Sequence, residues 1–260
     1  MSAHRPRKRF GQHFLHDAGV IRGIVDAIAP RRGEPLVEIG PGEGALTRPL
    51  LERGAVLQVV EVDRDLAASL RRTHGEALVI HCADALEFDF GSLPQGTRVA
   101  GNLPYNISTP LLFHLAHWLD HLGDLHFMLQ QEVVERMVAA ESTPAYGRLS
   151  VMLQVAYRME NLFGVPAESF TPPPKVESAV VRMTPIPAAQ RADVDAKVFS
   201  ELVARAFSAR RKTLRNALKL EEPVLASLGL DPKLRPENLS PADYIRVARH
   251  LSGRGYGGTA

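Results

Sequence analysis

A glycine-rich turn closes an apolar run in the stretch Leu36-Val37-Glu38-Ile39-Gly40-Pro41-Gly42-Glu43-Gly44. The apolar run predicts a buried strand, and the glycines let a ligand lie directly against the backbone. Glu61 and Asp63 end the next predicted strand, at the separation of about 20 residues where a carboxylate can hold ribose hydroxyls. The stretch therefore predicts a Rossmann-like α/β domain that holds a nucleoside-bearing cofactor.

Acidic residues at the strand ends favour a cationic cofactor. Asp84 ends the third predicted strand, where its carboxylate can accept a hydrogen bond from an adenine amine. With Glu38, Glu61 and Asp63 it places negative charge at one edge of the sheet, which a sulfonium tolerates and a pyrophosphate does not. The turn also lacks the Gly-x-Gly-x-x-Gly spacing of NAD sites. Spacing alone still leaves a nicotinamide-dependent dehydrogenase open.

The remaining elements alternate in type. Strands are predicted at 36–40, 56–63, 78–83, 98–101 and 125–129, and helices at 18–29, 45–53, 65–73 and 110–121. This order predicts a parallel sheet covered on both faces. Further helices are expected at 132–140 and 146–157, followed by a closing antiparallel pair at 162–165 and 176–183.

A proline-containing linker at 185–190 separates two predicted domains. We expect a cofactor-binding domain at 1–186 and a small all-helical domain at 187–260, whose glycine-rich end from residue 253 is predicted to be disordered.

The turn Asn102-Leu103-Pro104-Tyr105 follows the fourth predicted strand. It offers the Asn102 side-chain oxygen and the Leu103 carbonyl as acceptors for an amine, and Tyr105 as an aromatic platform for a ring. Such acceptors suit an exocyclic amine, whose lone pair must be aimed at the methyl group. A turn that merely caps a strand is the structural alternative. With the cofactor turn, the motif points to methyl transfer from S-adenosylmethionine to the exocyclic amine of a base.

Composition limits the other possibilities. The 260 residues are 45% hydrophobic, with a net charge of +2, so total charge does not indicate a nucleic-acid partner. Cys82 is the only cysteine, which excludes an internal disulfide and fits a reducing compartment. No secretory signal is visible at the charged start of the chain, and no apolar run approaches the length of a membrane helix. We expect a cytoplasmic protein without a membrane segment.

Basic residues gather in two places. Arg5, Arg7, Lys8 and Arg9 lie near the start, and Arg205, Arg210, Arg211, Lys212, Arg215 and Lys219 occur within 205–219 without an acid among them. On a helical wheel most of the second group share one face, whereas Arg210 falls on the apolar side, which predicts a helix break there. A basic face without interleaved acids favours contact with RNA phosphates over simple solvation.

Five motifs, in this order, resemble the small-subunit ribosomal RNA adenine dimethyltransferases. They are residues 7–15 (RKRFGQHFL), 37–42 (VEIGPG), 102–108 (NLPYNIS), 170–176 (FTPPPKV) and 210–216 (RRKTLRN). The resemblance runs from about residue 5 to about residue 250. It implies S-adenosylmethionine as cofactor. It also implies dimethylation at N6 of two adjacent adenosines in the 3′-terminal hairpin of 16S rRNA, by a monomer acting late in small-subunit assembly.

The resemblance also implies site residues. Cofactor contacts carry over to His13, Leu15, Gly40, Glu61, Asp84 and Asn102. From their own chemistry we predict target-base contacts at Asn102, Leu103, Pro104, Tyr105 and Phe170, and RNA contacts at Arg7, Lys8, Arg9, Arg211, Lys212 and Arg215.

One departure from the family pattern is clear, because the family usually has asparagine where this chain has His13. Phe170 is predicted as a second wall of the base slot opposite Tyr105, with a core or loop-anchoring phenylalanine as the alternative.

Three further alternatives remain open. The antibiotic-resistance methyltransferases of large-subunit rRNA share the glycine and Asn-x-Pro-aromatic motifs, although the motifs at 170–176 and 210–216 favour the small-subunit family. A non-catalytic assembly or transcription factor could use the same fold. His114, His117 and His121 fall on one predicted helix face, but nothing nearby completes a ligand set, so we expect no metal.

Overall fold

The computed structural model describes residues 12–253 and divides them into two compact units. Unit 1 comprises residues 12–134 and 158–185, and unit 2 comprises 135–157 and 186–253. The expected boundary near residue 186 agrees with this division, but 135–157 was expected in the first domain and lies in unit 2. The reason is packing, because Tyr146 and Val151 belong to the core cluster of the helical unit.

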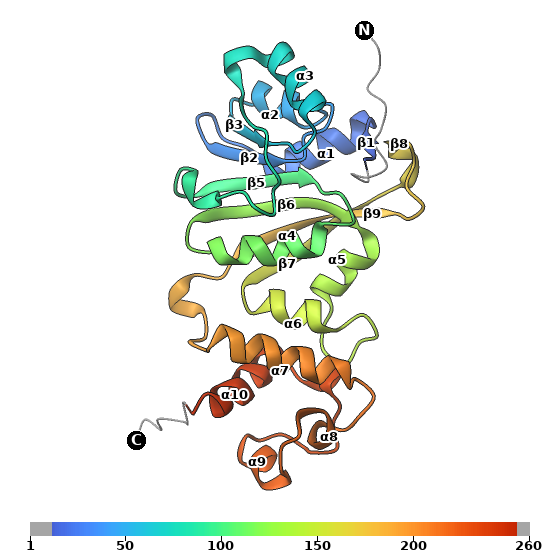
Figure 1. Ribbon diagram of the computed structural model, residues 1–260. Coiled ribbons are helices and arrows are strands. Elements are labelled where there is room, and N and C mark those ends of the chain that lie inside the picture. Colours follow the sequence, from blue (N-terminus) through green and yellow to red (C-terminus); the bar gives the residue numbers. More distant parts are fainter. Residues whose placement is uncertain (1–11, 254–260) are drawn as a thin grey trace. The chain divides into compact units, whose positions relative to one another are not determined.

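The central sheet has seven strands in the order β4-β3-β2-β5-β6-β9-β7 (Figure 1). β2 pairs in parallel with β3 and β5, β3 with β4, and β5 with β6, whereas β9 pairs antiparallel with β6. The bounds are β2 (Pro35–Ile39), β3 (Val56–Val60), β4 (Val79–His81), β5 (Thr97–Asn102), β6 (Leu122–Gln130), β7 (Tyr157–Val165) and β9 (Ser178–Pro185). Topology therefore confirms the Rossmann-like expectation, and the sheet closes with β9 antiparallel to β6 and β7 beside β9.

The helices of unit 1 connect these strands. They are α1 (Ala18–Ile28), α2 (Thr47–Glu52), α3 (Arg64–His74) and α4 (Ser108–Leu115), and α5 (Gln131–Val138) continues from unit 1 into unit 2. Side-chain caps fix two of the starts, since Asp17 accepts from Gly19 and Val20, and Asp63 accepts from Asp65. The short strand β1 (Phe14–Leu15) pairs antiparallel with β8 (Phe170–Thr171).

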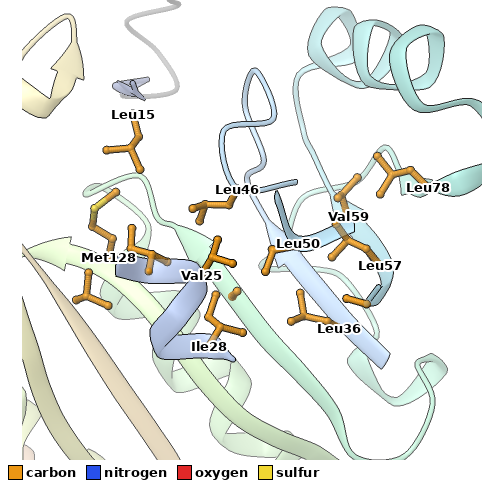
Figure 2. Packing of buried hydrophobic residues seen from close by; sticks show 14 of the residues in the cluster. Leu15, Val25, Ile28, Leu36, Leu46, Leu50, Leu57, Val59, Leu78 and Met128 are labelled. Atoms are coloured by element: carbon orange, nitrogen blue, oxygen red, sulfur yellow. The ribbon is translucent and has the colours of Figure 1, made fainter. Parts of the chain in front are cut away.

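One apolar cluster joins these elements into a core (Figure 2). Val25 and Ile28 of α1 pack with strand residues such as Leu36, Leu57 and Val59, all at most 2% exposed. Burial of these side chains against α1 holds the strands in the parallel register that brings the carboxyl ends of β2, β3 and β5 to one edge of the sheet.

Unit 2 is built mainly from helices. They are α6 (Arg148–Gln154), α7 (Ala196–Ser208), α8 (Leu214–Leu218), α9 (Glu222–Ser227) and α10 (Pro241–Leu251). The buried hydroxyl of Tyr146 donates to the Leu239 carbonyl, and that of Tyr244 donates to the Pro236 carbonyl, both at 2.8 Å. The expected helix at 146–157 is shorter in the structure, because Tyr157 already begins β7.

No helix among residues 12–253 is both long and apolar enough to cross a bilayer. The predicted disorder of the glycine-rich end from residue 254 onward lies outside the described residues.

Candidate functional site

A pocket of about 280 Å³ lies in unit 1, where the carboxyl ends of β2, β3 and β5 meet. Parallel strands bring their carboxyl ends to one edge, which is where ligands of doubly wound folds bind. The lining comes from residues 12–15, 38–43, 45–46, 60–62, Leu66, 83–85 and 102–107. It includes all six predicted cofactor contacts: His13, Leu15, Gly40, Glu61, Asp84 and Asn102.

Two glycines are needed for the close packing of this wall. Gly42 has φ of +59°, and a Cβ there would lie 3.2 Å from the Phe14 ring. A Cβ on Gly101 would lie only 2.5 Å from the carbonyl oxygen of Ile39. The glycine turn therefore lies against the N-terminal arm, and β5 approaches β2 more closely than any side chain would allow.

The carboxylate of Glu61 is fixed by backbone groups. It accepts from the N–H of Gly42 at 3.2 Å and from the N–H of Asp63 at 2.8 Å, and the residue is 5% exposed. Burial raises the pKa of Glu61, although the two backbone donors oppose that shift. These bonds hold the carboxylate at the pocket wall and tie the end of β3 to the glycine turn.

The two neighbouring aspartates have different roles. Asp63 is 1% exposed, caps α3 through Asp65, and accepts from Gln12 Nε2 at 3.3 Å, so it is a structural residue that does not line the pocket. Asp84 is exposed, accepts from the N–H of Leu86 at 2.9 Å, and lines the pocket.

The charge of the pocket is one-sided. Its lining carries four acidic side chains, Glu38, Glu43, Glu61 and Asp84, and no lysine or arginine among the described residues. Val62 adds an apolar wall, because it is 45% exposed and lines the same pocket. Val62 was not predicted as a lining residue. Its position between Glu61 and Asp63, at the end of a strand, could have indicated that it lines the pocket. Such a pocket fits a cationic nucleoside with an aromatic base.

Asn102 ends β5, and the N-terminal arm orients its side chain. Its Nδ2 donates to the His13 carbonyl at 3.1 Å, which leaves Oδ1 as the acceptor end of the amide. The N–H of Leu103 donates to Met128 at 3.2 Å. Within residues 12–253, no hydrogen bond reaches Asn102 Oδ1 or the Leu103 carbonyl oxygen. Two acceptors are therefore free on adjacent residues of the pocket lining.

Tyr105 is held from two sides. Its hydroxyl lies 2.8 Å from Ser178 Oγ on β9, and its ring stacks on His13, with centroids 5.8 Å apart. His13 Nδ1 donates to the Pro172 carbonyl at 2.7 Å. His13 therefore links the arm both to the Asn102–Tyr105 turn and to the proline-rich segment. Burial raises the pKa of Tyr105, which keeps the hydroxyl neutral.

Phe170 is not where the base-slot prediction needs it. Its side chain is 2% exposed, packs in the core cluster of unit 1 and does not line the pocket. β8 pairs with β1, Phe170 opposite Leu15, and this pairing turns the ring inward. The core-anchoring alternative is therefore the arrangement that the structure has.

Comparison with known proteins adds the family. The model of the ribosomal RNA adenine dimethylases matches residues 3–252, nearly the whole chain. The chain belongs to this family. It is therefore an S-adenosylmethionine-dependent rRNA adenine dimethyltransferase, which rules out the dehydrogenase and the non-catalytic factor. The acidic side chains of the pocket lining fit the cationic cofactor.

Relatives match the dimethyltransferase over its full length. It is 55% identical over 259 residues to "Ribosomal RNA small subunit methyltransferase A" of Chromobacterium violaceum, covering 98% of this chain and 99% of the relative. A protein of the same name from Thiobacillus denitrificans is 56% identical over 254 residues, covering 96% and 100%.

Two solved structures share the fold. A dimethyladenosine transferase from Plasmodium falciparum aligns with a TM-score of 0.82 and 24% identity, covering 94% of this chain and 98% of that one. The 23S rRNA methyltransferase ErmE aligns with a TM-score of 0.69 and 24% identity, covering 92% and 99%. At this identity they confirm the architecture only.

The basic run of unit 2 is not one helix. α7 ends at Ser208 and α8 begins at Leu214, so the shared helical face predicted for 205–219 is wrong, whereas the break predicted at Arg210 is confirmed. Arg210 pairs with Glu237 and donates to the Pro144 carbonyl at 2.9 Å. The predicted contacts Arg7, Lys8 and Arg9 lie outside the described residues.

The three histidines of α4 and its continuation have structural partners. His114, His117 and His121 each bond a backbone carbonyl, those of Phe88, His114 and Leu93 respectively. Across residues 12–253 no group of three or more potential ligands is placed to hold a metal ion.

Proposed function

We propose that this enzyme dimethylates N6 of two adjacent adenosines in the 3′-terminal hairpin of 16S rRNA, within the immature small subunit, as a cytoplasmic monomer. The observation that carries the proposal is the pair of free acceptors, Asn102 Oδ1 and the Leu103 carbonyl, on the wall of an acidic pocket. Full-length relatives at 55–56% identity that bear a small-subunit name support this choice over the large subunit.

The turn performs the orientation step. S-adenosylmethionine supplies an electrophilic methyl group when it is bound. Asn102 Oδ1 and the Leu103 carbonyl accept the two amine hydrogens of adenine, which directs the nitrogen lone pair away from the ring and toward the methyl group. Pro104 holds the turn, and Tyr105 stacks on the base. Positioning of this kind lowers the barrier without a strong base, because the amine loses its proton after attack.

The cofactor contacts divide by chemistry. Glu61 accepts from ribose hydroxyls, Asp84 accepts from the adenine amine, and Gly40 lets the ligand approach the backbone. His13 and Leu15 of the arm border the methionine end beside Asn102. All of these residues line the same pocket, which supports one continuous binding site.

RNA phosphates contact basic side chains away from the pocket. Arg211 and Lys212 are exposed and form no ion pair within the described part of the chain, which supports a phosphate contact. Arg215 is the third proposed contact and pairs with Glu222 at 3.1 Å. Arg7, Lys8 and Arg9 are proposed for the arm.

The test uses labelled S-adenosylmethionine and immature small subunits. Label should enter adjacent adenosines of the 3′-terminal hairpin, and Asn102→Ala should lower the transfer rate by roughly 100-fold or more while RNA affinity stays within twofold. Asn161→Ala, an exposed asparagine of β7, is the matched control and should keep the wild-type rate. Label elsewhere in the rRNA would refute the substrate, and near wild-type turnover by Asn102→Ala would refute the acceptor pair.

A further inference from the structure

Glu38 is a carboxyl group buried in the cofactor pocket. It lies on β2, is 2% exposed and lines the pocket. The hydroxyl of Thr47, a residue with 0% exposure, donates to Glu38 Oε2 at 2.6 Å. Within residues 12–253 this is the only hydrogen bond that the Glu38 carboxyl group makes, and no described residue bonds its other oxygen.

Within residues 12–253 no lysine or arginine side chain lines the pocket to compensate this charge. The titratable groups of the described lining around it are Glu61 from the end of β3, Glu43 from the glycine turn, Asp84 after β4 and His13 from the arm. The negative charge of Glu61 raises the pKa of Glu38 further, beyond the effect of burial. A buried carboxylate with one donor and an acidic neighbour is costly, unless a cation is present.

The two forms of the cofactor differ in charge. S-adenosylmethionine carries one net positive charge, because its sulfonium and ammonium outweigh one carboxylate. S-adenosylhomocysteine, the spent form, is a neutral thioether with no net charge. Both forms keep the ammonium and the carboxylate, so the pocket holds one more positive charge, that of the sulfonium, before methyl transfer than after it.

We infer that Glu38 is a specificity-determining residue that favours the charged donor over the spent product by giving up its proton when the donor binds. With the donor in the pocket the carboxylate is ionised, and the proton passes to solvent. With the product, the carboxyl group keeps or regains a proton, and the pocket no longer gains from holding the ligand. The inference rests on the cofactor of the family and is independent of which RNA is methylated.

The Glu38 carboxyl group changes its protonation state near neutral pH, where the affinity for each form of the cofactor can be measured. Burial raises its pKa to about 7, with the Thr47 hydrogen bond opposing and Glu61 adding to the rise. A bound cation lowers this pKa again, so the donor binds more tightly as pH rises through the value of the free protein. The neutral product gains nothing from the rise in pH. The preference for donor over product must therefore grow with pH and level off above about pH 8.

Calorimetry of the RNA-free enzyme with each form of the cofactor tests this inference. From pH 6 to 8.5 the ratio of the two dissociation constants, product over donor, should rise by roughly 10-fold, as a nearby charge predicts. Titrations in phosphate and Tris, which differ in ionisation heat, should show proton release with the donor only. In Glu38→Gln, a neutral analogue of the same shape, the ratio should be low and independent of pH.

Two further variants separate Glu38 from its neighbours. Glu43→Gln removes an exposed carboxylate of the same lining, and the pH dependence of the ratio should persist. Thr47→Val removes the donor to the carboxylate and should shift the rise to higher pH.

Either of two results would overturn the role of Glu38: an unchanged pH dependence in Glu38→Gln, or equal proton release with both forms in the wild type. If Glu38→Gln fails to fold, proton release by the wild type decides alone. Because no RNA is present, failure here leaves the proposed substrate untouched.

Discussion

At the scale of single residues, the Asn102–Tyr105 turn is held by Ser178, a residue far away in the sequence. Tyr105 and Ser178 are 73 residues apart and meet at 2.8 Å. Ser178 has no exposed surface and pairs with Gln130 in the β6–β9 register, so it is a rigid anchor. The hydrogen bond between the two hydroxyls therefore fixes the Tyr105 ring to β9, whereas the turn itself follows β5.

Removal of either hydroxyl should slow methyl transfer through the same effect. We expect Tyr105→Phe and Ser178→Ala each to lower kcat by about 3- to 10-fold, equivalent to one hydrogen bond of about 0.5–1.5 kcal/mol, while cofactor affinity is unchanged. The double variant should be no slower than either single variant. Single-turnover kinetics measures this coupling.

Ser169→Ala provides the control for the loss of a buried serine hydroxyl. Ser169 is 2% exposed, and its hydroxyl has no hydrogen-bond partner within residues 12–253, so its removal should leave kcat near the wild-type value. Additive losses in the Tyr105–Ser178 pair would show that Ser178 does not act through Tyr105. A Tyr105→Ala enzyme with normal turnover would instead refute the stacking role of the ring.

At the scale of elements, the turn between α7 and α8 decides which basic residues face solvent. Lys212 donates its N–H to Ala209 at 2.8 Å, and Leu214 donates to Leu234 at 2.7 Å, which closes the turn. Arg210 is held by Glu237, whereas Arg211 and Lys212 are exposed. One continuous helix would have placed these side chains differently, so the break itself creates the candidate RNA contact.

The salt dependence of RNA affinity tests this turn. Replacing Arg211 and Lys212 together by Gln should reduce the slope of log affinity against log salt by about 1.4–1.8 units, at about 0.7–0.9 per phosphate contact. Cofactor affinity should not change, and the loss should be equal for any RNA sequence, because phosphates carry no base identity. Filter binding of small-subunit particles at several salt concentrations measures the slope.

Arg71 and Arg72 of α3 supply the matched pair for that experiment. Both are exposed, and their replacement by Gln changes the net charge by the same amount in unit 1. In this double variant the slope of log affinity against log salt should stay close to the wild-type slope. Equal changes in both double variants would attribute the effect to net charge rather than to contact.

At the scale of the whole molecule, the two units have separate cores. The core of unit 1 joins α1, α2 and α3 to the sheet, and that of unit 2 joins α6, α7, α8, α9 and α10. Every residue that lines the cofactor pocket belongs to unit 1. Cofactor binding should therefore stabilise one unit directly and leave the other unchanged.

Hydrogen exchange with and without the cofactor tests this separation. At a free concentration about 100 times Kd, the most protected amides of β2, β3 and β5 should gain up to about 2.7 kcal/mol in opening free energy. The opening free energy of the most protected amides of α7 and α10 should change by less than about 0.5 kcal/mol, because independent sites affect each other by no more than this amount. An equal gain in unit 2 would mean that the two units open as a single cooperative body.

The alternation of strands and helices in a parallel sheet, the glycine turn and the Asn102–Tyr105 turn could be predicted from the sequence alone. These features depend on local conformation and on apolar periodicity, and both are written into neighbouring residues. The break near Arg210 was also foreseeable, since a charged side chain conflicts with an apolar helix face.

Only the tertiary structure decided how deeply individual side chains are buried and which distant residues they meet. Phe170 lies in the core because β8 pairs with β1, and residues 135–157 join unit 2 because Tyr146 packs there. The burial of Glu38 beside Thr47, like the Tyr105–Ser178 pair, results from contacts between separate elements. The burial of a side chain and its contacts depend on residues that are distant in the sequence. A local pattern of residues therefore cannot predict them.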